Sequence, residues 1–239
     1  MAPTLVLLHG FTHTGASWDR VVSALGERYL ALSPDLRGHG SAASGGPVAL
    51  DAVIEDVAGL AGGAATIAGY SMGGRLALHV ALAHPDRVPR LILIGASPGI
   101  EDRAEREARR SADERLATEV QQAGIEEFAR RWALTPVLAG LPPALAASVQ
   151  QDRLRSTTAG LAAALRGLGT GALPSLWDRL GELRMPVALI IGERDTKFRR
   201  IAESMAARLP EARLIVVAGA GHAVHLEAPE RVAEIIAEG

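Results

Sequence analysis

The sequence predicts an α/β fold, with a mostly parallel, doubly wound sheet and a helical segment inserted into it. Three observations support this prediction. Short apolar runs alternate with longer stretches of helical pattern. One long interval, residues 100–180, interrupts that alternation with charge-rich helical sequence and no convincing strand. A chain of 239 residues is long enough for one α/β domain with such an insertion.

Six apolar runs are predicted as strands that are buried on both faces, because they are nearly continuous rather than alternating. They are residues 4–9, 29–35, 65–70, 90–97, 187–193 and 213–219. The stretches between or after them that suit crossover helices are residues 17–26, 50–61, 72–84, 197–209 and 229–238. Buried strands separated by helices indicate a parallel sheet with helices on both faces.

The break in the pattern sets the expected domain organisation. Residues 1–99 and 181–239 form the α/β core, and residues 100–180 form a helical cap over the C-terminal edge of the sheet. The cap includes "EDRAEREARRSADERLATEVQQAG", which is charged throughout and helical in pattern.

Composition narrows the classes of function. Apolar residues make up 48% of the chain, charged residues make up 22%, and the net charge is −2, so nucleic acid and anionic membranes are poor partners. The absence of cysteine excludes disulfides, thiolate metal sites and a cysteine nucleophile. The segment "MAPTLVLLHG" has a short apolar run and no basic leader, which predicts neither a signal peptide nor a membrane span, so a cytoplasmic location is expected. Lys197 is the one lysine among 25 basic residues.

The segment "GYSMG" places Ser71 between a predicted strand and a predicted helix. This context is typical of the nucleophile elbow, in which a G-x-S-x-G turn exposes the serine hydroxyl at the end of a sheet. The alternative is a glycine-rich helix N-cap, because serine is a good capping residue.

A base and an acid follow in the order that such a serine needs. Asp195 in "IIGERDTKF" and His222 in "VAGAGHAVHLEAP" each come after a predicted strand. Glu193 is the competing acid, but we expect it to lie still within its strand, which favours Asp195. For Asp195 and His222 the alternatives are a turn residue and a structural loop histidine.

An oxyanion site is predicted beside the serine. The loop "LLHGF" follows the first strand, so the backbone N–H groups of Phe11 and Met72 are expected to converge on one developing negative charge. We interpret His9 as structural. For His39 and His225, contact with the substrate and a purely structural role both stay open.

These segments together resemble the α/β-hydrolase superfamily along the whole chain. The resemblance rests on "LLHGF", "DLRGHG", "GYSMGG", "GERD" and "GHAVHLEAPE". More narrowly, the chain is similar to the pyruvate-eliminating 2-succinyl-6-hydroxy-2,4-cyclohexadiene-1-carboxylate synthases of menaquinone biosynthesis. That similarity is carried by "GYSMGGRLAL", "ILIGASPGIEDRAEREARRSADERLA", "EFARRW", "PVLAGL", "RLRSTTAGLAAALRGLGTG" and "GERDTKF".

The narrower resemblance implies a small polycarboxylate substrate, which needs cations in the cleft. The residues that match the family's substrate-binding positions are Tyr70, Arg75, Arg109, Trp132, Arg155 and Lys197. The run "RAEREARR" reads equally as a solvated helix, and Arg106 or Arg110 are alternatives to Arg109. Trp132 is alternatively part of the cap core. The chain departs from related sequences at Ala133, where a second aromatic residue can occur.

The resemblance implies a lyase in which Ser71 acts as a base, activated by His222 and oriented through Asp195. A second hypothesis is a hydrolase of carboxylic esters or carbon–carbon bonds, with Ser71 as covalent nucleophile. A third is a non-catalytic binding protein. No metal or organic cofactor is expected, and no GxGxxG pattern follows the first strand. The oligomeric state does not follow from the sequence.

Overall fold

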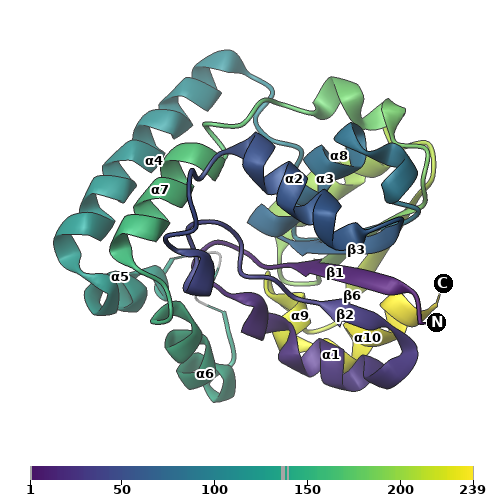
Figure 1. The fold of residues 1–239 in the computed structure, drawn as a ribbon, viewed down its shortest axis with the longest axis horizontal. Helices are drawn as coiled ribbons and strands as arrows, with labels where there is room; N and C mark the ends of the chain where they lie inside the picture. Colours follow the sequence, from purple (N-terminus) through teal and green to yellow (C-terminus); the bar gives the residue numbers. More distant parts are fainter. Residues whose placement is uncertain (1, 136–137, 139, 239) are drawn as a thin grey trace.

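The computed structural model describes residues 2–135, 138 and 140–238, and its core is a six-stranded sheet (Figure 1). Each strand pairs parallel with its neighbours, in the order β2-β1-β3-β4-β5-β6. The strands are β1 Thr4–Leu8, β2 Leu30–Leu32, β3 Ala65–Tyr70, β4 Leu91–Ile94, β5 Val187–Gly192 and β6 Ala212–Val217. The predicted doubly wound parallel sheet is confirmed.

Strand residues alternate between two apolar clusters on opposite faces of the sheet. In β1, Val6 and Leu8 pack into one cluster, whereas Leu5 and Leu7 pack into the other. All four are fully buried. Both faces of the strand are therefore covered, which is why its sequence is a continuous apolar run.

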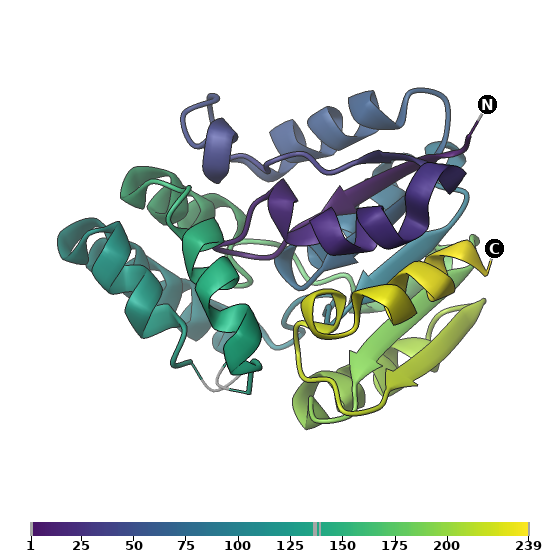
Figure 2. The same ribbon diagram turned by 90° about the horizontal axis from the view of Figure 1, so that it is seen from below.

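Two layers of helices provide this cover. Helices α2, α3 and α8 lie on one face, and α1, α9 and α10 lie on the other (Figures 1 and 2). Their bounds are α1 Asp19–Leu25, α2 Leu50–Ala61, α3 Met72–Ala83, α8 Thr196–Ala206, α9 Val224–Glu227 and α10 Pro229–Ala237. Short 3₁₀ helices are η1 Gly15–Trp18, η2 Gly26–Arg28, η3 Gly40–Ala42, η4 Pro85–Arg87 and η5 Trp177–Glu182.

Like β4, the edge strand β2 ends earlier than predicted; its predicted range is 29–35. It ends at Leu32, and Leu30 remains 56% exposed. At the sheet edge β2 pairs with β1 alone. Asp35, which was expected to end the strand, instead accepts a 2.8 Å hydrogen bond from the N–H of Gly15. The short helix α9 was not predicted.

In the described part of the long interval between β4 and β5 there are four α-helices. They are α4 Arg103–Ala123, α5 Ile125–Trp132, α6 Pro143–Arg153 and α7 Thr158–Leu168. Helices α4, α5 and α7 share a small apolar core made by Ala117, Val120, Phe128, Leu161, Ala162 and Leu165. Asp102 caps α4 by accepting the N–H of Glu105 at 2.8 Å. Residues 136, 137 and 139 of the segment "PVLAGL" lie outside the described residues.

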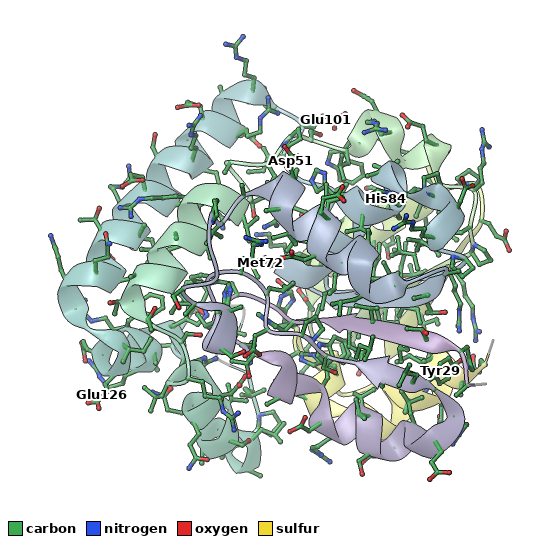
Figure 3. All side chains as sticks on the ribbon, in the orientation of Figure 1. Tyr29, Asp51, Met72, His84, Glu101 and Glu126 are labelled. Carbon is green, nitrogen blue, oxygen red and sulfur yellow. The ribbon has the colours of Figure 1, made fainter. Side chains whose placement is uncertain are left out.

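The inserted helices lie beyond one end of the sheet, on the side opposite the two chain ends (Figures 1 and 2). Figure 3 shows Met72, the first residue of α3, where the sheet meets these helices, and Glu126 of α5 on their outer side. The carboxyl ends of the strands therefore face the inserted helices, and this edge is where ligands bind in open parallel sheets.

None of the described helices has the length and apolar character needed to cross a membrane.

Candidate active site

Ser71 occupies a sharp corner between β3 and α3. Its backbone has φ 50° and ψ −107°, and Thr12 is the other described non-glycine residue with positive φ. Glycines make room for the corner, since a Cβ on Gly73 would lie 2.2 Å from the carbonyl oxygen of Leu8. The Ser71 N–H donates to the Ile94 carbonyl at 2.8 Å. This is the geometry that the "GYSMG" segment predicts for an elbow.

His222 and Asp195 converge on the serine from two other strand ends. His222 Nε2 lies 3.3 Å from Ser71 Oγ, and Nδ1 lies 2.6 Å from Asp195 Oδ2. A carboxylate only accepts hydrogen bonds, so Nδ1–H donates to Asp195 and Nε2 is left as the acceptor that faces the serine hydroxyl. The other oxygen of Asp195 accepts the N–H of Phe198 at 3.2 Å, which fixes the carboxylate at the start of α8.

Glu193 does not reach this histidine. It lies one residue beyond β5 rather than inside it, so that expectation is wrong by one residue. Its exposed carboxylate accepts the N–H of Gly219 at 2.9 Å. Asp195 is therefore the carboxylate beside His222.

A cavity of about 910 Å³ opens over Ser71. Phe11 and Met72, the predicted oxyanion residues, both line it together with His222. Met72 begins α3, so its N–H has no acceptor four residues earlier in the helix, and the positive end of the helix dipole points to the same place. The structure brings both backbone segments beside the serine, and their role as donors to an oxyanion stays a prediction.

Charged side chains of both signs line the cavity. The cations are Arg75, Arg109 and Lys197, and the acids are Glu101, Asp102 and Glu105. We did not predict the acids, although "SPGIED" follows a strand end and so belongs at the same edge of the sheet. Two of these acids have partners within the protein: Glu101 pairs with Arg208 at 3.3 Å, and Asp102 caps α4.

Arg75 is a buried cation on the first turn of α3. It is 7% exposed, and its Nη2 donates to the Leu168 carbonyl at 3.0 Å. Its Nε has no hydrogen-bond partner within the described structure. Burial, followed by repulsion from Arg109, lowers the pKa of Arg75 to about 10, while Asp113 acts in the opposite direction. A buried guanidinium with a free N–H beside a cavity is suited to an anionic ligand.

On α4, Arg109 is the arginine that faces the cavity. Its Nε donates to Asp113 Oδ1 at 2.7 Å, and about half of its side chain is exposed. Arg110 lines a different surface groove, and Arg106 Nη1 donates to the Ile100 carbonyl at 3.0 Å. Neither is among the residues that line the cavity over Ser71.

Trp132 and Lys197 also line the cavity. Trp132 ends α5, and its ring meets Phe11 edge to face with centroids 5.2 Å apart. It also stacks on Phe128, so it belongs to the core of the inserted helices as well. Lys197 lies in the first turn of α8, and its Nζ is 5.6 Å from the centroid of the Phe198 ring.

Tyr70 and Arg155 do not line the cavity. The buried Tyr70 ring lies between His222 and His225, with centroids 5.2 Å and 4.3 Å away, and burial raises its pKa. Arg155 is exposed in the turn that follows α6. Two residues earlier, Arg153 is buried at the end of the helix. Neither arginine lines the cavity in this structure, and the substrate-binding role expected of Arg155 stays a prediction.

The other histidines lie outside the cavity as well. His9 Nε2 accepts the Leu36 N–H at 2.9 Å, so Nδ1–H donates to the Gly10 carbonyl, and burial lowers its pKa to about 4. This agrees with a structural role. His39 and His225 are fully buried, and burial also lowers their pKa values.

The cavity has no obvious metal site. Within the described ranges, no three histidine, aspartate or glutamate side chains gather as metal ligands would. The groups that converge on Ser71 are a histidine, a carboxylate behind it and backbone N–H groups. They suit proton transfer to and from the serine hydroxyl and the stabilisation of a developing oxyanion.

Comparison with known proteins assigns the fold to a family. The model of the family described as "Alpha/beta hydrolase family" matches residues 5–235. The chain belongs to this family. It is an enzyme of the alpha/beta hydrolase superfamily, homologous to 2-succinyl-6-hydroxy-2,4-cyclohexadiene-1-carboxylate synthases.

Three relatives illustrate the range within the alpha/beta hydrolase family. A putative 2-succinyl-6-hydroxy-2,4-cyclohexadiene-1-carboxylate synthase of Bacillus subtilis is 35% identical over 98% of this chain and 89% of the relative. The structure of MenH from S. aureus superposes with a TM-score of 0.93 at 31% identity, covering 99% of this chain and 92% of that one. A pimeloyl-[acyl-carrier protein] methyl ester esterase of Nitrosomonas europaea is 31% identical over 96% and 92% of the two chains.

Proposed function

We propose that this chain is a lyase that eliminates pyruvate from 2-succinyl-5-enolpyruvyl-6-hydroxy-3-cyclohexene-1-carboxylate. The product would be 2-succinyl-6-hydroxy-2,4-cyclohexadiene-1-carboxylate, an intermediate of menaquinone biosynthesis. The observation that carries the proposal is Arg75, which has a buried guanidinium with an unpartnered Nε and lines the same cavity as Ser71. The name of the Bacillus subtilis relative, a putative 2-succinyl-6-hydroxy-2,4-cyclohexadiene-1-carboxylate synthase, supports the same substrate class.

In this proposal the catalytic residues are Ser71, His222 and Asp195. The His222 ring takes the proton of the serine hydroxyl, and Asp195 stabilises the resulting imidazolium. The serine oxygen then removes a proton from a ring carbon. The electron pair of that C–H bond shifts into the ring, a new C=C bond forms, and the C–O bond to the enolpyruvyl group breaks. Pyruvate leaves as its enolate and is protonated afterwards.

The remaining predicted residues have supporting roles. The backbone N–H groups of Phe11 and Met72 hold negative charge as it develops on oxygen. Arg75, Arg109 and Lys197 bind the substrate carboxylates and so fix the ring relative to the serine. Trp132 forms an apolar wall. Residues 100–180 act as a cap over the core formed by residues 1–99 and 181–239.

A second candidate function is hydrolysis of a carboxylic ester or a carbon–carbon bond, with Ser71 as a covalent nucleophile. The observation that favours it is the acidic wall of Glu101, Asp102 and Glu105 in the same cavity, because these side chains would repel a substrate with several carboxylates. The esterase from Nitrosomonas europaea has a comparable identity to this chain. The same three catalytic groups serve either reaction, so the contents of the cavity decide between them.

Two assays on the same preparation separate these functions. Pyruvate release from the enolpyruvyl substrate is followed with a coupled dehydrogenase, and p-nitrophenyl acetate is hydrolysed in parallel. The proposal predicts rapid pyruvate release that Ser71→Ala abolishes, together with weak ester hydrolysis. Rapid ester hydrolysis without pyruvate release would establish a hydrolase instead.

A further inference from the structure

The loop after β1 contains a second strained residue, Thr12. Its φ of 70° lies in the left-handed region, which a β-branched residue rarely adopts. Thr12 is the third residue of a turn closed by a 3.2 Å hydrogen bond from the His13 N–H to the Gly10 carbonyl, and positive φ at this position favours glycine. Thr12 is fully buried, and its Oγ1 has no hydrogen-bond partner in the described structure. Its hydroxyl therefore contributes no bond that would hold this conformation.

A carboxylate from the inserted helices holds the two residues that follow Thr12. Asp152, near the end of α6, accepts the backbone N–H of Thr14 at 3.1 Å and the Nδ1–H of His13 at 3.1 Å. The Thr14 hydroxyl donates to its other oxygen. Burial by itself would raise the pKa of Asp152, but the hydrogen bonds from His13 and Thr14 lower it overall. The side chain is therefore an ionised acceptor of several charge-assisted hydrogen bonds.

The neighbouring parts of the loop are fixed by the core rather than by the insertion. His9, at its start, accepts the Leu36 N–H, and Asp35 accepts the Gly15 N–H at 2.8 Å. Between these anchors, Asp152 supplies bonds from an element that is 138 residues away in the chain. A strained backbone conformation persists where contacts with the surrounding structure hold it in place. Asp152 is the charged group that makes such contacts here.

We propose that Asp152 is a positioning residue for the oxyanion site. It holds the turn from Gly10 to His13 in the conformation that presents the Phe11 N–H beside Ser71. The inference rests on the oxyanion role proposed for Phe11. It adds that helix α6 of the insertion, and not the α/β core alone, determines the geometry of that donor.

The first test uses a reagent that needs no natural substrate. A fluorophosphonate phosphonylates an activated serine, and its rate depends on the oxyanion donors, so it is followed at Ser71 by intact mass. Asp152→Ala should lower the rate about 10- to 100-fold, because a misplaced donor is nearly as harmful as a missing one. Asp152→Asn should lose less, since its amide oxygen still accepts the Thr14 N–H. The turnover number for pyruvate release should fall in parallel, with little change in KM.

A matched control and a rescue separate positioning from general destabilisation. Glu114→Gln removes a carboxylate that pairs with Arg166 at 2.8 Å within the insertion, away from the loop, and should leave labelling unchanged. Thr12→Gly in the Asp152→Ala background should restore several-fold of the lost rate, because glycine adopts positive φ without external support. A purely structural loss would not be restored in this way.

The proposal is overturned if folded Asp152→Ala, or folded Asp152→Asn when the alanine variant does not fold, labels Ser71 at the wild-type rate. It is also overturned if Thr12→Gly restores nothing. Absence of pyruvate release by the wild-type protein would instead refute the proposed lyase function, while the labelling comparison would still decide the role of Asp152.

Discussion

Ser71 has a backbone conformation that costs a residue with a Cβ about 1–3 kcal/mol. The surrounding structure offsets that cost through the 2.8 Å hydrogen bond from the Ser71 N–H to Ile94 and the close packing of Gly73 under β1. The result is a hydroxyl held 3.3 Å from His222 Nε2 at the floor of the cavity. Strain of this kind is expected where reactivity, not stability, determines the residue.

Two substitutions of Ser71 should separate the strain from the chemistry. Ser71→Ala keeps a Cβ in the strained conformation and should abolish turnover with little change in melting temperature. Ser71→Gly should also be inactive, but more stable than Ser71→Ala by up to about 1 kcal/mol, because relief of positive φ exceeds the entropy penalty of glycine. Thermal unfolding followed by circular dichroism compares the two variants. A glycine variant that melts below the alanine variant would argue against strain at this corner.

Some single residues could be placed from the sequence and others could not. Ser71, Asp195 and His222 each follow a strand of the parallel sheet, and parallel strands end at the same edge, so their proximity follows from the pattern. The exposed position of Arg155 could not be predicted, because it depends on where α6 ends, and helix ends depend on local capping and packing that a polar, charged segment does not reveal. Arg153, two residues earlier in the chain, is buried.

Helix α4 contributes side chains both to the cavity and to an outer groove. Its sequence is charged on every side, yet Glu105 and Arg109 line the cavity, whereas Arg110 lines an outer groove. Successive residues on a helix are 100° apart, so neighbours in sequence face different surroundings. The pattern "RAEREARR" predicts the helix, but the side of it that faces the core depends on contacts with α7, which are known only from the structure.

Adjacent arginines on α4 provide a matched pair. Arg109→Ala should raise KM for a carboxylate substrate about tenfold, the value of one charge-assisted hydrogen bond at a half-exposed position. Arg110→Ala should change KM less than twofold. Steady-state kinetics on both variants tests the assignment, and equal effects would show that α4 acts through its overall charge.

The strands were predicted more closely than the helices of the insertion. All six runs contain strands within a few residues of their predicted bounds, and in the central strands burial on both faces makes the sequence continuously apolar. The edge strands β2 and β6 each pair with one neighbour and are partly exposed, so burial constrains their sequences less. The helices α4 to α7 could be predicted as a helical region only, without individual bounds.

At the scale of the whole molecule, buried neutral histidines make the free energy of unfolding depend on pH. Burial lowers the pKa of His9 from 6.5 to about 4 and that of His39 from 6.5 to about 3. The unfolded chain therefore binds more protons than the folded protein between pH 6.5 and these values. The contribution of these neutral histidines to the free energy of unfolding is fully present above pH 6.5 and is lost as the pH falls below that value.

Urea unfolding at a series of pH values measures this effect. Acidification from pH 7 to pH 5 should lower the free energy of unfolding by about 2 kcal/mol for each such histidine. His39→Gln removes one titrating group and should flatten the dependence on pH. An unchanged slope in that variant would show that other groups govern the acid sensitivity.

The positions of the tryptophans give the molecule a built-in optical reporter. Trp132 and Trp177 line the cavity over Ser71, whereas Trp18 is fully buried in the core, against His225. An occupant of the cavity therefore alters the emission of the first two without disturbing the third, and unfolding exposes all three to water. Occupancy and global unfolding thus have separate fluorescence signatures in the unlabelled protein, and each can be titrated without a chromogenic substrate.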